Sequence, residues 1–485
     1  MAVKMEEYTG GSVEAEHLCV LVHGLWGNPN HMWAIAKALR AAYPPEQLYI
    51  LVAKRNSGSF TYDGIELGGE RVCLEIEEEL DLIRSRGGNI TKLSMVGYSL
   101  GGLVARYAIG LLYARGVLDR LECMSFTAFA SPFLGVRTPL RGVSNQLFNV
   151  LGARTLCMSG RQLFGIDRFR DTGKPLLAVL ADPGSVFMCG LARFKRRTLY
   201  SNIVNDRSAT YYTTYISKTD PFADLSKVQV RFLEGYGDVI LDPENPVLPD
   251  PPQKAPEPFT ESVLRLARRV PVWIALSLFI PLGVVAFLVN SAVQTVRSAR
   301  RVKLHESGLA GVPVKEFRQL DLWIRDLREA VEHTYENLNS AQDQEYLLVD
   351  SGDKGSRGAR QRNGVQSQQQ QQQRTCASDG EEVTLGSSGG SDVSSDDDQT
   401  AEDREILALE RKQSRTHEGP FPTLALAPYQ FAAIQALDRL GWRKYPVWIH
   451  KHRHSHAAII VRMNKPGFEE GNVVLRHWVT EEFLA

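Results

Sequence analysis

Residues 17–245 alternate between short apolar runs and longer stretches in which apolar residues recur with helical spacing. The apolar runs are rich in β-branched residues and lie at 18–22, 48–53, 93–98, 121–130 and 198–205. Helical patterns occupy about 30–42, 66–86 and 100–115. Because strands that alternate with helices form βαβ units, this part of the chain is predicted to be an α/β core with a mostly parallel central sheet flanked by helices.

The last segment, 419–485, is again globular in pattern, and we expect it to be the C-terminal part of the same core. A helical pattern lies near 428–439, and strand-like runs lie at 445–450, 457–463 and 472–476. Of the remaining chain, residues 1–16 are predicted to be a polar tail and residues 311–340 a helical segment.

Residues 246–310 join a proline-dense linker to a long uncharged run. The stretch from Val270 to Val296 has 27 residues and no charge, which exceeds the roughly 20 apolar residues that cross a bilayer core. We predict that 270–296 associates with a membrane, and a buried core helix is the alternative. Basic residues flank both ends: Arg265, Arg268, Arg269, Arg297, Arg300, Arg301 and Lys303.

Residues 341–418 have a composition that does not support a packed core. They include six consecutive glutamines at 368–373, a Ser/Gly run and the cluster Asp396-Asp397-Asp398. Such a segment buries too little apolar surface to offset the entropy of ordering, so it is predicted to be a disordered loop.

Charge and cysteine content narrow the possible functions. Lysine plus arginine and aspartate plus glutamate each number 56, so the formal net charge is zero and a chain-wide basic field for nucleic acid is excluded. The six cysteines form no C-x-x-C pair, which favours a reducing intracellular compartment over a disulfide framework. The polar, acidic start of the chain also lacks the pattern of a secretory signal.

The most specific motif is a G-x-S-x-G sequence that follows an apolar strand and opens a helical pattern: Gly97-Tyr98-Ser99-Leu100-Gly101-Gly102. This is the context of a nucleophile elbow, in which a strained strand-to-helix turn presents the serine and flanking glycines allow close packing. The motif predicts an α/β-hydrolase fold with Ser99 as the nucleophile.

A second motif, His23-Gly24-Leu25-Trp26-Gly27, ends the first predicted strand. In serine hydrolases of this architecture, the loop at this place and the residue after the nucleophile supply the two backbone N–H groups of the oxyanion hole. We assign these donors to Leu25 and Leu100, with Trp26 as the alternative to Leu25. His23 is expected to order the loop through its own hydrogen bonds.

Three stretches together resemble the fungal putative serine esterase family, which includes the lipid-droplet phospholipases of yeasts. They are Val20 to Gly27, Gly97 to Tyr107 and Ala130-Ser131-Pro132-Phe133-Leu134-Gly135. The resemblance covers roughly 17–245 and the last sixty residues. It implies an α/β-hydrolase fold, a Ser-Asp-His triad and glycerolipid ester substrates.

The acid of such a triad follows the serine along the chain and precedes the histidine. Asp206 ends a predicted strand and is similar to the family's acid motif, with one departure: the family usually has Val-Pro where this chain has Ala209-Thr210. Asp206 is therefore the predicted acid, with Asp220 and Asp238 as rivals.

Four histidines alternate near the end of the chain: His450, His452, His454 and His456. On an extended strand their imidazoles would share one face, which would suit a metal site or a solvated tract. The family's histidine directly precedes a run such as Ile459-Ile460-Val461, and the resemblance therefore selects His456, with His454 as the alternative. His477 is interpreted as structural.

These residues predict a serine hydrolase that cleaves glycerolipid esters without a cofactor or metal. Ser99 would attack, His456 would act as base and Asp206 would orient the imidazole. Residues 137–197 are a possible lid, with apolar residues Phe148, Leu151, Leu163, Phe164 and Phe187. Two alternatives share these motifs: an acyltransferase that uses the same acyl-enzyme, and a catalytically silent tether on a lipid surface.

The order of the triad limits how residues 270–296 meet a membrane. Ser99 and Asp206 precede this segment and His456 follows it, so a single span would separate the base from the nucleophile. A hairpin turning at Pro281-Leu282-Gly283, or a helix lying in the interface, keeps them on one side. The interfacial helix would be steered to anionic head groups by Arg268, Arg269, Arg300 and Arg301. We therefore expect a cytosol-facing enzyme on lipid droplets or endoplasmic reticulum, a location that the resemblance also implies.

Overall fold

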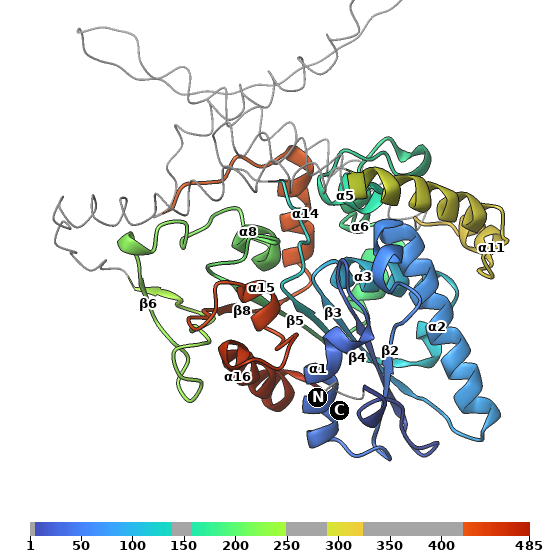
Figure 1. Cartoon of the computed structure of the whole chain (residues 1–485), viewed down its shortest axis with the longest axis horizontal. Helices are drawn as coiled ribbons and strands as arrows, with labels where there is room; N and C mark the ends of the chain where they lie inside the picture. Colours follow the sequence, from blue (N-terminus) through green and yellow to red (C-terminus); the bar gives the residue numbers. More distant parts are fainter. Residues whose placement is uncertain (1–4, 138–156, 249–288, 324–420) are drawn as a thin grey trace, which may run out of the picture. The chain divides into compact units, whose positions relative to one another are not determined.

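The computed structural model describes residues 5–137, 157–248, 289–323 and 421–485. Within these residues a parallel six-stranded sheet has the order β2-β1-β3-β4-β5-β8, and Figure 1 shows it at the centre of the fold. The strands are β1 (His17–Val22), β2 (Leu48–Val52), β3 (Lys92–Tyr98), β4 (Glu122–Phe129), β5 (Arg196–Asn202) and β8 (Arg443–Val447). The predicted α/β-hydrolase fold is confirmed, and its last strand comes from the C-terminal segment.

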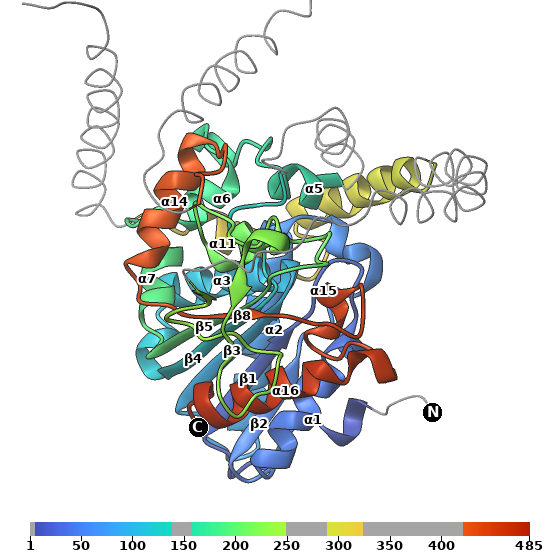
Figure 2. The same ribbon diagram turned by 90° about the vertical axis from the view of Figure 1, so that its left-hand side faces the viewer.

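Helices cover both faces of this sheet (Figures 1 and 2). α2 (Ile65–Ser85), α3 (Leu100–Ala114), α7 (Val186–Ala192) and α14 (Pro428–Asp438) contribute to the apolar cluster on one face. α1 (Trp33–Ala42) and α16 (Glu470–His477) contribute to the cluster on the other. Strand β1 explains the division, because Leu18, Val20 and Val22 enter the first cluster, whereas Cys19 and Leu21 enter the second.

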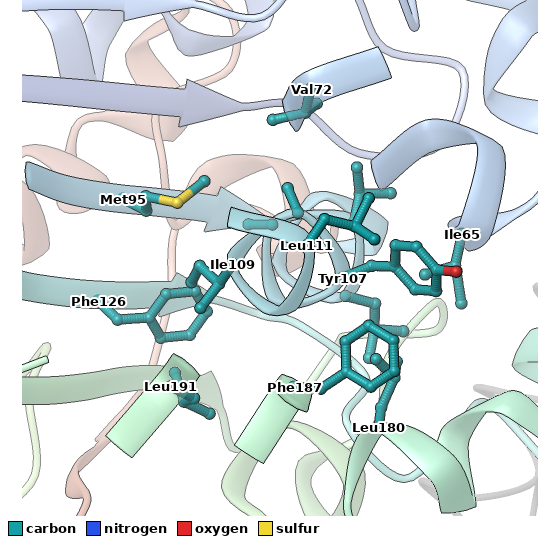
Figure 3. Packing of buried hydrophobic residues seen from close by; sticks show 14 of the residues in the cluster. Ile65, Val72, Met95, Tyr107, Ile109, Leu111, Phe126, Leu180, Phe187 and Leu191 are labelled. Atoms are coloured by element: carbon teal, nitrogen blue, oxygen red, sulfur yellow. The ribbon is translucent and has the colours of Figure 1, made fainter. Parts of the chain in front are cut away.

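The larger cluster is built around α3, which is buried from Leu100 to Leu112. In Figure 3, side chains of α3 lie between the sheet residues Met95 and Phe126 and the α7 residues Phe187 and Leu191. A helix that is apolar all round is typical of a helix buried between layers. This packing fixes α3, and with it the turn that precedes its first residue.

Shorter elements complete the described part of the chain. They are the helices α5 (Cys157–Leu163), α6 (Leu176–Leu180), α8 (Tyr211–Tyr215), α11 (Val314–Gln319) and α15 (Ser455–Ala458), and the hairpin of β6 (Gln229–Val230) with β7 (Val247–Leu248). Residues 289–306 are also helical and are coloured yellow in Figures 1 and 2. Within the predicted polar tail, Gly10 pairs with Ile50 at the edge of β2.

Two strand predictions in the C-terminal segment are wrong. The run 457–463 begins inside α15, and the run 472–476 lies within α16. A short apolar run cannot by its pattern distinguish a strand from a buried helical turn. Ala458, Ile459 and Ile460 are completely buried, and the contacts of this compact turn outweigh β propensity.

Three of the apolar residues named for the possible lid at 137–197 are packed into the core. Leu163, Phe164 and Phe187 are all buried, and Phe187 lies against Tyr107 with ring centroids 4.8 Å apart. Phe148 and Leu151 lie outside the described residues, as do 138–156 in general. Ile166 of the same stretch is 50% exposed, and the lid itself stays a prediction.

Most of the segment predicted to meet a membrane also lies outside the described residues, because the structure describes only 289–296 of 270–296. Among the helices that are described, none is both long and apolar enough to cross a bilayer. The predicted disordered loop 341–418 falls wholly within residues that are not described.

Candidate active site

Ser99 lies in the sharp turn between β3 and α3, with φ 54° and ψ −129°. A serine in this region of backbone space is strained, and such strain concentrates at functional sites. The glycines of the motif make the turn possible: a Cβ on Gly101 would lie 2.1 Å from the carbonyl oxygen of Val22, and one on Gly97 would lie 2.3 Å from the Cα of Gly102. From the end of β4, Ser131 donates its hydroxyl to the Ser99 carbonyl at 2.7 Å. The turn is thus fixed from several sides.

His456 reaches Ser99 from α15. Its Nε2 lies 2.9 Å from Ser99 Oγ. Two contacts position the short helix: Tyr98 donates its hydroxyl to the His456 carbonyl at 2.9 Å, and the Ser455 hydroxyl donates to the Val204 carbonyl at 2.7 Å. The imidazole is therefore placed by residues that flank both the nucleophile and the acid.

Asp206 lies in the loop after β5 and faces the other imidazole nitrogen. Its Oδ2 is 2.8 Å from His456 Nδ1 and its side chain is only 2% exposed. Asn202 Nδ2 donates to Oδ2 at 2.9 Å, and the backbone N–H groups of Ser208 and Ala209 donate to Oδ1 at 3.0 and 2.8 Å. These donors stabilise a buried carboxylate, which is costly without such partners.

The departure from the family's acid motif leaves this geometry intact. Ala209 supplies a backbone N–H, as the valine of the family would. Thr210 has φ −64°, which is the value that a proline ring imposes. The backbone of Thr210 is thus compatible with a proline at this position.

The rival acids have other hydrogen-bond partners, although Asp220 lines the same pocket as Asp206. Asp220 accepts a hydrogen bond from the Phe222 N–H at 3.0 Å, and burial raises the pKa of its carboxyl to about 6. Asp238 accepts from His450 Nε2 through its backbone carbonyl, at 2.7 Å. Of the three candidates, Asp206 is the one whose carboxylate meets His456.

The expectation that the four histidines share one strand face is wrong. Strand β8 ends at Val447 and α15 begins at Ser455. The rings have different neighbours. His450 stacks on Trp448 at 4.6 Å, and His452 meets Phe468 edge-on at 4.8 Å. The His454 ring lies 5.7 Å from that of His452, and the His454 backbone N–H donates to His452 Nδ1 at 3.0 Å. Among the described residues, no group of three or more His, Cys, Asp or Glu is placed to hold a metal ion.

The loop after β1 lies directly over the nucleophile, since a Cβ on Gly24 would be 2.7 Å from the Ser99 Cβ. Trp26 has φ 56° and donates its backbone N–H to Thr61 Oγ1 at 3.0 Å. Because that N–H is already used, Leu25 is the better oxyanion donor in this loop. The second proposed donor, Leu100, is the first residue of α3, where backbone N–H groups have no partner within the helix.

The remaining histidines near the site have structural contacts. His23 is buried, its Nδ1 lies 3.1 Å from the Gly24 carbonyl oxygen, and burial lowers the pKa of its imidazole. His477 Nδ1 lies 2.7 Å from the Tyr200 hydroxyl, and burial lowers its pKa to about 4. Both rings are thus kept neutral.

Sequence reasoning missed four residues that support the site: Thr61, Tyr98, Ser131 and Asn202. Tyr98 and Ser131 lie inside motifs that were recognised, although no role was assigned to them, and Asn202 lies four residues before the acid. Thr61 has no comparable signal, because it meets Trp26 from the short 3-10 helix Gly58–Tyr62, 35 residues further along the chain.

A hydroxyl, an imidazole and a buried carboxylate linked in this order, beside the backbone N–H groups of Leu25 and Leu100, form the arrangement that supports acyl transfer through a serine. The imidazole accepts the hydroxyl proton, and the carboxylate stabilises the imidazolium that results. All of these groups belong to the chain itself.

Known proteins resemble this chain over less than half of its length. A family model described as Putative serine esterase (DUF676) matches residues 12–219. The Saccharomyces cerevisiae protein named Putative lipase ROG1 is 32% identical over 226 residues, which are 44% of this chain and 31% of that protein. Putative lipase YDL109C of the same yeast is 31% identical over 208 residues, which are 41% and 30% of the two chains. The matched region is thus about a third of the length of these curated relatives.

Solved structures match with low scores. Phospholipase PlaB from Legionella pneumophila has a TM-score of 0.26 and 12% identity, with 42% of each chain covered. Trichoderma reesei cutinase has a TM-score of 0.19 and 17% identity, with 26% of this chain and 57% of that chain covered. The fold assignment therefore rests on the sheet order and the nucleophile elbow. The resemblance seen in the sequence motifs is confirmed: residues 12–219 are similar to the family described as Putative serine esterase (DUF676).

Proposed function

We propose that this protein is a carboxylic ester hydrolase that uses a Ser99–His456–Asp206 triad. The observation that carries the proposal is the continuous hydrogen-bonded chain from Ser99 Oγ through His456 to Asp206, with distances of 2.9 and 2.8 Å. The three side chains come from three separate parts of the sequence, so their alignment is not a local coincidence of packing.

The proposed reaction has two acyl-transfer steps. Ser99 Oγ attacks the ester carbonyl while His456 Nε2 takes its proton, and the imidazolium then gives that proton to the leaving alkoxide. An acyl-enzyme remains, and water hydrolyses it with His456 again acting as base. Leu25 and Leu100 N–H groups stabilise the oxyanion in both steps, and one such donor is typically worth a factor of about 10²–10³ in rate.

The proposed substrates are glycerolipids, phospholipids among them. Relatives that bear the name lipase support this class, and so does the uncharged run 270–296 in the same chain. A surface enzyme of this kind would meet its substrate where the acyl ester lies, at the boundary between head groups and chains. The head group and acyl position remain to be measured with defined lipids.

The proposed location is the cytosolic face of lipid droplets or endoplasmic reticulum, with 270–296 in a hairpin or interfacial arrangement. The contact of His456 with both Ser99 and Asp206 supports the hairpin or interfacial arrangement over a single span. His456 follows the apolar run in sequence and the other two residues precede it, so all three must lie on one side of the membrane. Tags at residues 1 and 485 should both be cleaved by protease in intact microsomes. Protection of one tag in an active enzyme would contradict the arrangement.

The triad is tested most directly by Ser99→Ala. We expect loss of ester hydrolysis and of labelling by a fluorophosphonate probe, because no other side chain takes the place of the acyl acceptor. A matched control is Ser85→Ala, which removes an exposed hydroxyl at the end of α2, far from the turn in sequence, so labelling should persist. Wild-type turnover by a pure, folded Ser99→Ala protein would refute the proposal.

A further inference from the structure

The helix formed by residues 289–306 has its polarity reversed relative to an ordinary surface helix. Its buried positions are polar: Ser291, Ser298 and His305 are 6%, 3% and 0% exposed. Its exposed positions include Val289, Val293, Val296 and Leu304, which are 60%, 43%, 54% and 51% exposed. A surface helix normally buries its apolar stripe against the core, and here that stripe faces outward.

Ion pairs on the inner face hold the helix in this orientation. Arg301 binds the Asp63 carboxylate through Nε and Nη2 at 2.8–3.1 Å, and Ser298 Oγ donates to the same carboxylate at 2.7 Å. Asp63 is completely buried and also pairs with Arg71 at 2.9 Å. Arg301 is therefore not free to steer the chain towards lipid head groups, contrary to the expectation from sequence.

A second pair lies one turn further along. His305 Nε2 is 2.5 Å from Glu70 Oε2, and both side chains are completely buried. If the helix rotated to bury its valines, Asp63 and Glu70 would be left in the interior without these partners, which is strongly unfavourable. The outward direction of the apolar stripe is thus built into the fold.

The same outward face is basic. Val289, Val293, Val296, Arg300 and Leu304 follow one another at intervals of three or four residues, and Arg297 and Lys303 flank them. All three cationic residues are exposed, and residues 289–305 contain no aspartate or glutamate. Apolar side chains interleaved with cations are the pattern of a helix that lies in the head-group region of an anionic bilayer.

We propose that the outward face of the 289–306 helix docks onto an anionic phospholipid surface. A second copy of the chain fits less well, because a two-fold contact through this face would bring the same cations together. The helix also directly follows the uncharged residues 270–288, so both would meet the same surface. This proposal specifies the surface on which the proposed lipid hydrolase would act, and its biological role rests on that proposed function. Docking itself can be measured without catalysis.

The docked helix is joined to the loop over the nucleophile. Arg301 Nη2 donates to the Ser59 carbonyl at 2.8 Å. Ser59 belongs to the 3-10 helix Gly58–Tyr62, and Thr61 of that helix accepts the Trp26 N–H at 3.0 Å. Docking would therefore hold the loop that carries Leu25 at a fixed place relative to the lipid surface.

Vesicle binding of the full chain tests the proposal, with phosphatidylcholine vesicles compared with vesicles that also contain phosphatidylserine. A charge variant (Arg297→Gln, Arg300→Gln, Lys303→Gln) should lose about tenfold or more in binding to the anionic vesicles and most of the salt dependence. An apolar variant (Val293→Ser, Val296→Ser, Leu304→Ser) should bind both kinds of vesicle more weakly.

The matched control removes three exposed cations elsewhere, by Arg84→Gln, Arg86→Gln and Arg120→Gln, and should bind as the wild type does. Circular dichroism and thermal unfolding establish that each variant is folded. Undiminished binding by the charge and apolar variants would overturn the proposal. So would a dimer that the apolar variant abolishes while vesicle binding stays unchanged, because the face would then join two copies.

The outcome is separable from that of the proposed function. Hydrolysis of a short-chain, water-soluble ester by the wild type reports on the triad without a lipid surface. Vesicle binding without such hydrolysis would leave the docking face in place and refute the hydrolase. Hydrolysis of the soluble ester, together with vesicle binding that the charge and apolar variants do not weaken, would support the hydrolase and refute the docking face.

Discussion

The nucleophile and the base of the proposed triad are positioned in opposite ways. Ser99 is held by its own neighbourhood, through the strained turn, the flanking glycines and Ser131, 32 residues away. His456 depends on partners far away in sequence: Tyr98 at 358 residues, Asp206 at 250 and, through Ser455, Val204 at 251. One half of the site is thus encoded locally and the other half by tertiary structure.

Strand β8 makes the second half possible. It pairs in parallel with β5, with Asn202 opposite Val447, so the chain leaves the sheet next to the loop that holds Asp206. From there α15 turns His456 back towards Ser99. A local motif can form its turn as soon as its strand and helix pack, whereas the base arrives only when the last strand of the sheet is in place.

Removal of the base should have the largest effect in this comparison. His456→Ala is expected to lower kcat for a soluble ester by about 10⁴–10⁶, because an unassisted serine hydroxyl is a poor nucleophile at neutral pH. His452→Ala and His450→Ala are the controls and should stay within about threefold of wild type, since their rings contact Phe468 and Trp448 instead. Comparable losses in all three variants would show that the histidine cluster acts as a unit.

The acid should follow with a smaller loss. Asp206→Asn is expected to lower kcat by about 10⁴, since the amide no longer stabilises the imidazolium or the required tautomer. Asp220→Asn is the matched control. The group changed in Asp220 is also a carboxyl, and burial raises its pKa to about 6. Its side chain, however, accepts a hydrogen bond from the Phe222 N–H and not from His456. If Asp220→Asn proves the more damaging change, Asp206 is not the acid.

The same contrast explains what could be predicted from sequence. The strands β1 to β5 and the elbow around Ser99 were accessible, because their signals are local: β-branched runs and glycines at fixed spacing. The helices at 455–458 and 470–477 were not, because tertiary packing decides them. His456 itself was selected through a family resemblance. No periodicity pointed to Thr61, or to the burial of Arg301 against Asp63.

Thr61 offers a finer test of the locally encoded half. Thr61→Val keeps the shape of the side chain but removes the acceptor of the Trp26 N–H, and the loop that carries Leu25 should then be less well fixed. We expect kcat to fall about tenfold with little change in KM, since the oxyanion forms only during reaction. Ser57→Ala is the control, because Ser57 is the half-buried N-cap residue of the same 3-10 helix and its side chain makes no cap hydrogen bond. A rise in KM alone would indicate a binding defect and contradict this role.

Deletion of residues 345–415 should have the smallest effect on activity. It tests whether the placement of His456 depends on the long connection that precedes it in the chain. His456 reaches the site through β8 and its pairing with β5, and none of the side chains that build the site belongs to 345–415. Shortening a connection of this length changes its closure free energy by only about 1 kcal/mol, and in the favourable direction. We therefore expect soluble-ester hydrolysis within about twofold of wild type, measured together with thermal unfolding to show that the shortened chain is folded. A tenfold loss in a folded deletion variant would mean that the connection itself helps to bring the histidine to the serine, and the base would then depend on more than the last strand of the sheet.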